Sequence, residues 1–315
     1  MNPACYTLPV MAIIITAVVC THNRARALTG TLHSLCCQTL EPELFEILVV
    51  DNASTDHTPE VVEKFRNQGT GISIQWIEEP RLGLGYARNA GWHNAAGNIV
   101  AYIDDDAEAD AGWLEALLTI MLSNHDIWVA GGKVLPIWDG ERPSWLKDDL
   151  LNAISLLDRS EQMGIIEWPE RLIGTNIAFR RKVFEEVGGF DPRLGRQGNR
   201  LASEEETDMQ QRVHRVGGKV FYIPSAVVYH HVFPERLTKR YFYSRSFGTG
   251  QSRAVLACRQ LKGLGRAGLL LRTAAGLVFY LFRAMISVGV ESRFRNVRVV
   301  YGKWGYFCQI VKPAV

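Results

Sequence analysis

Three consecutive carboxylates form the most unusual cluster in the sequence, within VAYIDDDAEAD at residues 100–110. Asp104, Asp105 and Asp106 follow an apolar run, repel one another and have no lysine or arginine beside them. A calcium loop of the EF-hand type would need flanking helices and a glycine at its sixth position, where Ala109 stands. What remains is a D-x-D pair at the end of an expected buried strand. Because such hard oxygen ligands suit Mg²⁺ or Mn²⁺ shared with a diphosphate, the sequence predicts a divalent metal as the missing positive partner.

A second acidic cluster lies in LASEEETDMQQRVHRVGG, where Glu204, Glu205, Glu206 and Asp208 begin an expected helix. Acidic side chains favour helix N-termini through the helix dipole, which accounts for one or two of the four. We therefore expect a general base among these residues, able to take a proton from a hydroxyl group.

Further polar residues follow other expected strands. In VVDNASTDHTPEVV, Asp56 serves as a helix cap, which leaves Asp51 to accept hydrogen bonds from a base or a ribose. Arg88 in RLGLGYARNAG follows a glycine turn that matches neither the dinucleotide-binding nor the Walker motif, and alone it could simply pair with an acid. The stretch IPSAVVYHHV ends with His230 and His231, of which one could be a ligand and either could be structural.

Short β-branched runs alternate with helical stretches, which favours an α/β fold with a doubly wound, mostly parallel sheet and flanking helices. The expected strands are 13–19, 46–50, 72–77, 99–103, 127–134, 220–223 and 227–229. The expected helices are 25–37, 58–67, 84–95, 111–122 and 204–216. Ligands of such sheets bind at the carboxyl ends of strands, and CTHNR, DNASTD and DDD follow the first, second and fourth strands.

Seven stretches together resemble the family 2 glycosyltransferases of GT-A fold. They are VVCTHNRARAL, ILVVDNASTDHT, RLGLGYARNAG, YIDDDAEADAGWL, GTNIAFRRKVFEEVGGFDPRLG, EEETDMQQRV and VVYHHVFPERLT. Each is weak alone, but all seven occur in the family's order. The resemblance implies a GT-A-type sheet, and transfer of a sugar from a nucleotide-diphosphate sugar to an acceptor hydroxyl with inversion at the anomeric carbon.

The resemblance also implies which residues bind the nucleotide. Asp51 would hold the base and Asp104 would meet the ribose. The full nucleotide-binding set would be Thr21, Asn23, Arg24, Asp51, Asn52, Arg88, Asp104 and Asp105.

The remaining roles concern the metal and the reacting groups. Asp106 and His230 would hold the metal, Mn²⁺ or Mg²⁺, and Asn176 in GTNIAF would contact the sugar donor and the acceptor. The catalytic base would be the second acid of the family's pair, Glu206. Glu205 stays an alternative, because this chain has a third glutamate where the family often has glycine before the pair.

Charge is divided unevenly along the chain, although the net charge is only +2. From Arg236 onward there are fifteen lysines or arginines and one acid, Glu291, which leaves 20 bases and 32 acids in the residues before. We expect an N-terminal extension (1–10), a GT-A catalytic domain (11–235, with a nucleotide-binding half 11–106 and an acceptor half 107–235) and a basic helical tail (236–315).

The tail contains an apolar run at 266–290, which Arg272 and Arg283 divide into pieces of at most ten uncharged residues. A membrane-spanning helix needs about 20 predominantly apolar residues. The run is therefore interpreted either as a helix lying on an anionic membrane surface or as an ordinary core helix. Nucleic-acid binding is not expected, because no recognised module accompanies the basic residues.

Six cysteines without a CxxC motif predict unpaired thiols in a reducing compartment. With the basic tail, they predict a cytoplasmic protein on the inner face of the cell membrane, with a saccharide or lipid-linked acceptor and a role in polysaccharide or glycolipid synthesis. Two alternatives stay open. A nucleotidyltransferase would typically carry a glycine-rich loop where CTHNRAR stands, and a non-catalytic nucleotide-sugar-binding module would typically have lost its D-x-D motif or its base.

Overall fold

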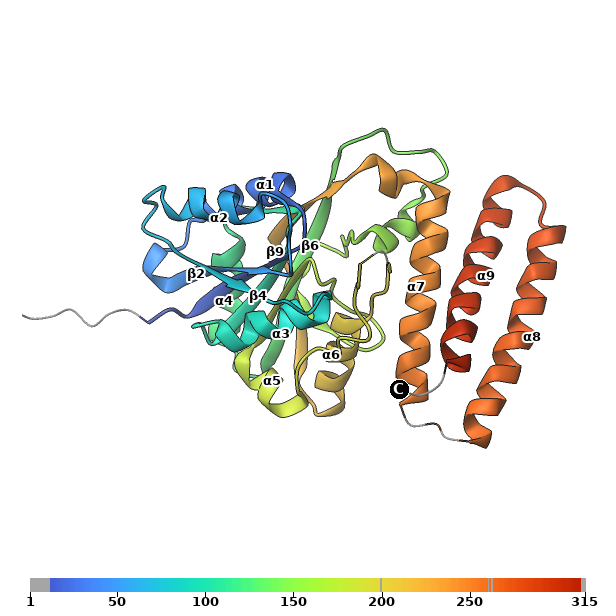
Figure 1. Cartoon of the computed structure of the whole chain (residues 1–315). Coiled ribbons are helices and arrows are strands. Elements are labelled where there is room, and N and C mark those ends of the chain that lie inside the picture. The colour runs from blue at the N-terminus through green and yellow to red at the C-terminus, as the bar shows by residue number, and fades with distance from the viewer. Residues whose placement is uncertain (1–11, 199, 260, 262, 313–315) are drawn as a thin grey trace, which may run out of the picture.

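The computed structural model of the protein describes residues 12–198, 200–259, 261 and 263–312 (Figure 1). The strands are β1 (Ile15–Thr21), β2 (Phe45–Asp51), β3 (Ser73–Glu78), β4 (Ile99–Asp104), β5 (Ala107–Ala109), β6 (Ile127–Trp138), β7 (Gly164–Ile166), β8 (Asn176–Arg180) and β9 (Lys219–Val232). The helices are α1 (Ala25–Cys36), α2 (Thr58–Arg66), α3 (Leu84–Asn94), α4 (Trp113–Ser123), α5 (Arg181–Val187), α6 (Glu205–Arg215), α7 (Lys239–Cys258), α8 (Leu264–Ile286) and α9 (Val290–Val311). Short 3₁₀ helices are η1 (Pro42–Leu44), η2 (Asp148–Ile154) and η3 (Pro234–Leu237). The predicted extension at 1–10 lies outside the described residues.

One sheet organises the described chain, in the order β3-β2-β1-β4-β8-β6-β9-β5, with β7 beside β9. The four N-terminal strands β1 to β4 pair in parallel, and β6 and β9 share their direction. The short strands β5, β7 and β8 run the opposite way. The predicted α/β fold is confirmed, as a mixed sheet in which the long strands are parallel. The sequence pattern misses β8, because NIAFR is only 5 residues long and begins with a polar side chain.

Strand β9 is longer than its sequence pattern indicates. It is continuous over 14 residues where two short strands are predicted. Its register against β6 is irregular between Gly132 and Val134, so that four residues, 224–227, fall between paired positions. A Cβ atom at Gly132 would lie 2.1 Å from the carbonyl oxygen of Ala226, so only glycine permits this close approach. The bulge lets one strand continue to His230, at the edge where the site forms.

Helices cover both faces of the sheet. On one face, α1, α2 and α4 bury apolar side chains such as Leu32, Phe65 and Trp113. On the other face, α3, α5 and α6 contribute a second apolar cluster that includes Phe184 and Met209. Burial on both faces explains why the central strands are continuous apolar runs, and it leaves the strand ends as the place for polar side chains.

The C-terminal helices form a separate layer beside the sheet, in which α9 packs between α7 and α8 (Figure 1). Leu146, Phe242 and Phe294 belong to the apolar cluster that joins the η2 segment to α7 and α9. Helix α8 is outermost, and Thr273, Leu277 and Ala284 are its buried residues. The predicted helical tail is confirmed, but the interpretation of the apolar run as a core helix is wrong.

The expectation that Arg272 and Arg283 leave the apolar run too short for a membrane-spanning helix is corrected by the structure of α8. Its most apolar 18-residue window has a mean hydropathy of 1.6, and only 17% of that window is buried. By length and composition alone, α8 could therefore cross a membrane as well as lie on one.

Candidate active site

The strand register places the predicted polar residues side by side at the carboxyl ends of β1, β2 and β4. Thr21 pairs with Asp51 across β1 and β2, and Cys20 pairs with Asp104 across β1 and β4. The acidic run is held from two sides, because Thr21 Oγ1 donates a hydrogen bond to Asp105 (2.8 Å) and Thr175 Oγ1 donates one to Asp104 (2.6 Å).

Two arginines neutralise the acidic run. Nη1 of Arg24 lies 3.2 Å from Asp105 Oδ1 and 2.5 Å from Asp106 Oδ2, and Nη2 of Arg236 lies 2.5 Å from the same Asp106 oxygen. Burial raises the pKa of Asp105 to about 6, although Arg24 opposes this. Burial acts in the same direction on Asp106, but His230 and Arg236 hold the pKa of Asp106 well below its usual range. The expectation that a metal alone supplies the positive charge is therefore corrected, because arginines far away in sequence supply part of it.

Asp104, Asp106 and His230 could hold a divalent metal. Each offers one ligand atom, and the three atoms lie within 4.8 Å of one another. The buried imidazole places Nε2 3.3 Å from Asp106 Oδ1 and 2.8 Å from an Arg236 nitrogen, and its Nδ1 has no hydrogen-bond partner among the described residues. Two carboxylates and one imidazole are ligands that suit Mn²⁺ or Mg²⁺, so these residues fit the predicted metal.

The pair of glutamates at the start of α6 faces Arg88. Nη1 of Arg88 lies 3.1 Å from Glu205 Oε1 and 3.8 Å from Glu206 Oε2, and its Nη2 lies 3.6 Å from Asp104 Oδ1. This buried guanidinium therefore links the D-x-D motif to the acid pair. Burial, and next the Glu206 carboxylate, raise the pKa of Glu205 to about 7, although Arg88 opposes this. The side chain of Glu206 is 16% exposed and that of Glu205 3%, so Glu206 is the acid that a substrate reaches more readily.

Glu204 adopts a backbone conformation that explains its unusual position in the motif. Its φ of 104° falls in the region that favours glycine. The family often has glycine immediately before the acid pair, and this geometry supports the alignment that makes Glu205 and Glu206 that pair. The Glu204 carboxylate is held by Arg253, with Oε1 3.0 Å from Nε.

Three predicted nucleotide-binding residues hold loops around the site. Asn52 accepts a hydrogen bond from the backbone N–H of Gly83 and donates two to carbonyls of the preceding loop. Asn23 Oδ1 accepts a hydrogen bond from the backbone N–H of Thr55, and Asp51 Oδ1 accepts one from the backbone N–H of Ser54. In the part of the chain that the structure describes, Asn23 and Asp51 do not line the pocket.

Asn176 lies in the core. It is 0% exposed, and its Oδ1 accepts a hydrogen bond from Trp113 Nε1 (2.9 Å), while its Nδ2 donates to the carbonyls of Lys133 and Ala226. These bonds give Asn176 a structural task within the sheet, and they do not support the predicted contact with substrate. Thr175 of the same segment lines the pocket instead.

The pocket between these groups has a volume of about 240 Å³. The predicted residues that line it are Thr21, Arg24, Asn52, Arg88, Asp104, Asp105, Asp106, Glu205 and Glu206. Arg196 and Arg245 line it as well. No sequence motif marks these two arginines or Arg236, because they are isolated arginines in a loop and at the start of a basic tail.

The mixed sheet, with a D-x-D motif at the end of β4 and an acid pair across the pocket, defines a fold of the GT-A type. A family model described as "Glycosyl transferase family 2" matches residues 16–188. The chain belongs to glycosyl transferase family 2, which confirms the resemblance seen in its motifs.

Similar proteins share most of the chain. The glucosyl-dolichyl phosphate glucuronosyltransferase of Haloferax volcanii is 31% identical over 247 residues, which are 77% of this chain and 77% of that protein. Among solved structures, the mannosyltransferase PcManGT of Pyrobaculum calidifontis, in complex with GDP-Man and Mn²⁺, superposes with a TM-score of 0.58 at 18% identity, over 92% of this chain and 87% of that one. S. aureus TarS 1–349 in complex with UDP-GlcNAc superposes with a TM-score of 0.53 at 19% identity, over 79% of this chain and 68% of that one. These two structures show the shared fold.

Proposed function

We propose that the protein transfers a sugar from a nucleotide-diphosphate sugar, favouring UDP-sugars, to a hydroxyl of a saccharide or lipid-linked acceptor, with inversion and with the help of Mn²⁺ or Mg²⁺. The observation that carries the proposal is the single guanidinium of Arg88, which contacts both Asp104 and the acid pair. It sets a candidate base beside candidate metal ligands in one pocket. Complexes of similar folds with GDP-Man and UDP-GlcNAc support a nucleotide-sugar donor.

Asp104, Asp106 and His230 would hold the metal. When bound, such an ion stabilises the negative charge that develops on a departing diphosphate. Arg196 and Arg245 line the same pocket and add fixed positive charge, which needs no rearrangement as the bond breaks.

Glu206 would act as the general base. Its carboxylate takes the proton of the acceptor hydroxyl while that oxygen forms its bond to the anomeric carbon, and the bond from this carbon to the diphosphate breaks. A single displacement of this kind inverts the anomeric centre. Glu205 is a positioning residue, because its contact with Arg88 fixes the start of α6 and thereby the direction of Glu206.

Turnover of donor with and without metal tests the proposal. We expect the protein to release UDP or GDP from one nucleotide sugar in the presence of Mn²⁺ or Mg²⁺. Because a metal supplies several kcal/mol of charge stabilisation, EDTA should lower this rate by about a hundredfold or more, and added Mn²⁺ should restore it. A rate that stays unchanged in EDTA would contradict the role given to the metal ligands.

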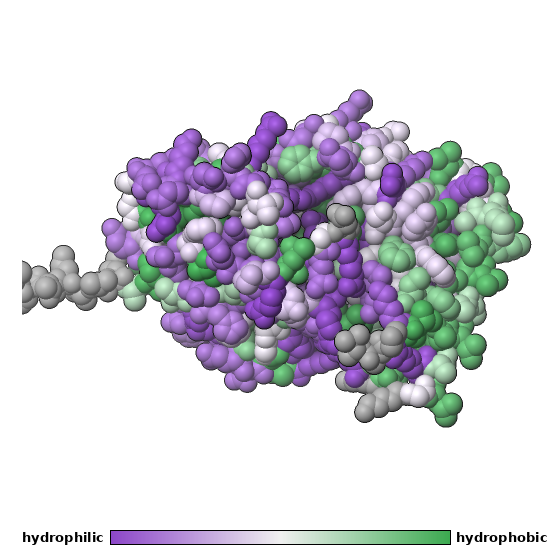
Figure 2. Space-filling model, in the orientation of Figure 1, coloured by the Kyte–Doolittle hydropathy of each residue, from purple (hydrophilic) through white to green (hydrophobic). Residues whose placement is uncertain are grey.

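We further propose that the exposed side of α8 holds the protein on the inner, cytoplasmic face of the cell membrane. There it would carry out a step of polysaccharide or glycolipid synthesis. Leu264, Leu271, Val278 and Met285 recur every seven residues on one face of α8 and are 68–92% exposed. Figure 2 shows hydrophobic surface gathered over this part of the molecule. An apolar stripe on a tail that holds fifteen bases and one acid suits a surface of anionic lipid.

Binding to vesicles tests this location. The protein should sediment with phosphatidylglycerol vesicles at low salt, and replacing Leu271 and Met285 together by glutamate should release most of it, since two charges would then enter the apolar stripe. The matched control is Leu122→Glu on α4, another exposed leucine, which should sediment like the unchanged protein. Recovery of the unchanged protein in the supernatant would contradict the proposed location.

A further inference from the structure

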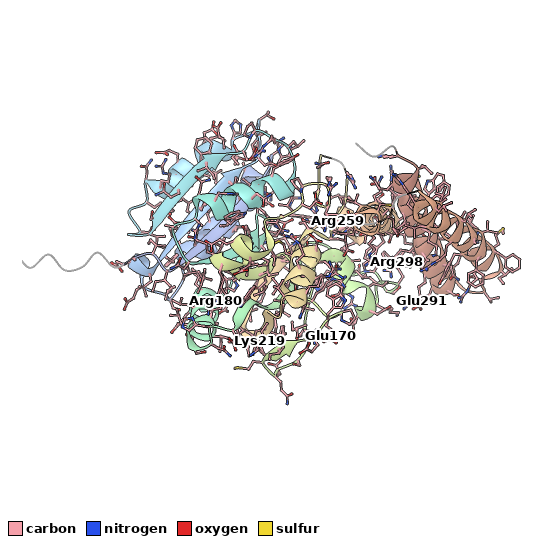
Figure 3. All side chains as sticks on the ribbon, turned by 90° about the horizontal axis from the view of Figure 1, so that it is seen from below. Glu170, Arg180, Lys219, Arg259, Glu291 and Arg298 are labelled. Carbon is pink, nitrogen blue, oxygen red and sulfur yellow. The ribbon has the colours of Figure 1, made fainter. Side chains whose placement is uncertain are left out.

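A second and much larger cavity lies between the sheet domain and the C-terminal helices. Its volume is about 1480 Å³, against about 240 Å³ for the pocket of the D-x-D motif. Its walls come from η2 and the segment after it, from the start of α6, and from α7, α8 and α9. Arg298 and Glu170, both labelled in Figure 3, line it from the helical layer and from the sheet domain respectively. The cavity exceeds the 300–1,000 Å³ typical of small-molecule sites, so it can take a long ligand.

This cavity adjoins the pocket of the D-x-D motif, here called the donor pocket, at the proposed base Glu206. Glu206 and Arg245 line both spaces, together with Ser203. A group that lies in the large cavity therefore reaches the Glu206 carboxylate without passing through the pocket of the D-x-D motif. This is the position that an acceptor hydroxyl must occupy if Glu206 takes its proton.

The charges of the cavity are unbalanced. Every carboxylate that lines it has a cationic partner within 4.0 Å, as Asp148 has Arg142 (2.6 Å) and Asp149 has Arg295 (2.5 Å). By contrast, five of its cations have no carboxylate within that distance in the described ranges. They are Arg171, Arg245, Arg272, Arg298 and Lys303.

Three of these cations, Arg245, Arg298 and Lys303, are partly buried, whereas the other two are exposed. A partly buried cation without a carboxylate partner favours an anion from outside the chain. Within the described residues, Arg245 donates only to the backbone carbonyls of residues 201 and 202. Burial, and next the nearby Arg196, lower the pKa of Arg245, and burial lowers the pKa of Arg298. Lys303 of α9 lies against α8 at Gly276, where a Cβ atom would lie 2.8 Å from its Nζ, and this Nζ is 5.4 Å from the centroid of the Tyr280 ring. Several cations on the walls of one cavity, none with a carboxylate within 4.0 Å among the described residues, suit a phosphate-binding site.

The same cavity lies directly beneath the proposed membrane surface. Exposed Arg272 and half-buried Tyr280 of α8 line the cavity, whereas the outer side of the helix carries the exposed apolar stripe. A ligand with a charged head and a hydrocarbon tail matches both sides of this helix. Its head would lie among the five cations while its tail stays in the lipid.

We propose that the large cavity binds the acceptor, and that this acceptor is a lipid linked through a phosphate or diphosphate to the hydroxyl-bearing group. The inference rests on the proposed function, and it narrows the acceptor from a saccharide or lipid-linked molecule to an anionic lipid-linked one. Arg298 and Lys303 hold the phosphate from α9, Arg272 holds it from α8, and Arg245 lies between the phosphate and the reacting hydroxyl.

Binding of a short lipid phosphate tests this site apart from the donor pocket. The probe is geranyl diphosphate, compared with inorganic pyrophosphate and with geraniol, all in EDTA so that metal-dependent binding at the D-x-D motif is removed. We expect geranyl diphosphate to bind best. Replacing Arg298 or Lys303 by methionine should weaken its binding about tenfold or more, since each removes a charged hydrogen bond. The matched control is Arg293→Met, an exposed arginine on the same helix outside the cavity, which should bind like the unchanged protein.

Each remaining outcome decides against the proposal. If pyrophosphate bound as tightly as geranyl diphosphate, the lipid chain would not contribute to recognition. If geraniol bound as tightly, the phosphate would not contribute. If Arg293→Met weakened binding as much as Arg298→Met or Lys303→Met, the cavity would not be the binding site. Binding of UDP with Mn²⁺ is measured on the same variants and should be unchanged. If the unchanged protein bound none of UDP, GDP and dTDP with Mn²⁺, the proposed function would fail, while the result with geranyl diphosphate would still decide whether the cavity binds a lipid phosphate.

Discussion

Replacing Glu206 by glutamine is expected to lower kcat by about 10²–10⁴-fold, the usual contribution of a positioned general base. Glutamine keeps the size of the side chain but cannot accept the proton of the acceptor hydroxyl. Since Glu206 contacts Arg88 only at 3.8 Å, the substitution should leave UDP binding and the urea midpoint close to those of the unchanged protein. Steady-state kinetics with a saturating acceptor separate this loss of kcat from a change in KM.

Glu205→Gln is the matched comparison. Burial and the Glu206 carboxylate raise the pKa of Glu205 to about 7, so its neutral form is accessible near neutral pH, and a neutral amide imitates that form. We expect a loss of kcat below about tenfold at pH 7, much less than a missing base would cause. If Glu205→Gln abolished turnover while Glu206→Gln kept it, the base would be Glu205.

Replacing Arg88 by alanine is expected to lower the free energy of unfolding by about 3–5 kcal/mol, as the removal of one partner from a buried ion pair does. The side chain is buried and compensates Glu205, Glu206 and Asp104 at 3.1, 3.8 and 3.6 Å. Without it, these carboxylates face one another with no cation between them. Urea unfolding followed by circular dichroism measures the change.

Arg66→Ala is the control for Arg88→Ala. Arg66 pairs with Glu63 at 3.1 Å on the exposed side of α2, where such pairs contribute about 0–1 kcal/mol. We therefore expect a small loss of unfolding free energy for Arg66→Ala and a large one for Arg88→Ala. Similar small effects at both positions would show that Arg88 is not the group that holds the acidic site together.

The parallel half of the sheet could be predicted from the sequence because its strands are buried on both faces. Runs such as FEILVVD and IVAYID are almost wholly apolar, and their 7 and 6 residues match a strand well. The antiparallel strands β5 and β7 are only 3 residues long, too short for any period to be visible. The continuity of β9 depends on a glycine of another strand, Gly132, and no local pattern in β9 itself shows it.

The candidate site divides in the same way. Asp104, Asp106 and Glu206 could be found because acids that cluster at a strand end or a helix start exceed what structure alone requires. The arginines that face them could not be found, because a guanidinium pairs across space and carries no constraint on its sequence neighbours. Arg236 lies 130 residues from Asp106 along the chain, yet it donates to that carboxylate. The family resemblance of GTNIAF implies that Asn176 contacts substrate, whereas its hydrogen bonds tie three buried segments together.

Calorimetry of nucleotide binding tests whether Asp106 helps to hold a metal-dependent nucleotide site. UDP, GDP, CMP and dTDP are each titrated into the unchanged protein and into Asp106→Ala, with Mn²⁺, Mg²⁺ or EDTA. We expect that one nucleoside diphosphate binds, that its binding requires the metal, and that Asp106→Ala abolishes it. Binding that is the same in EDTA, or that survives in Asp106→Ala, would contradict the site proposed at the end of β4.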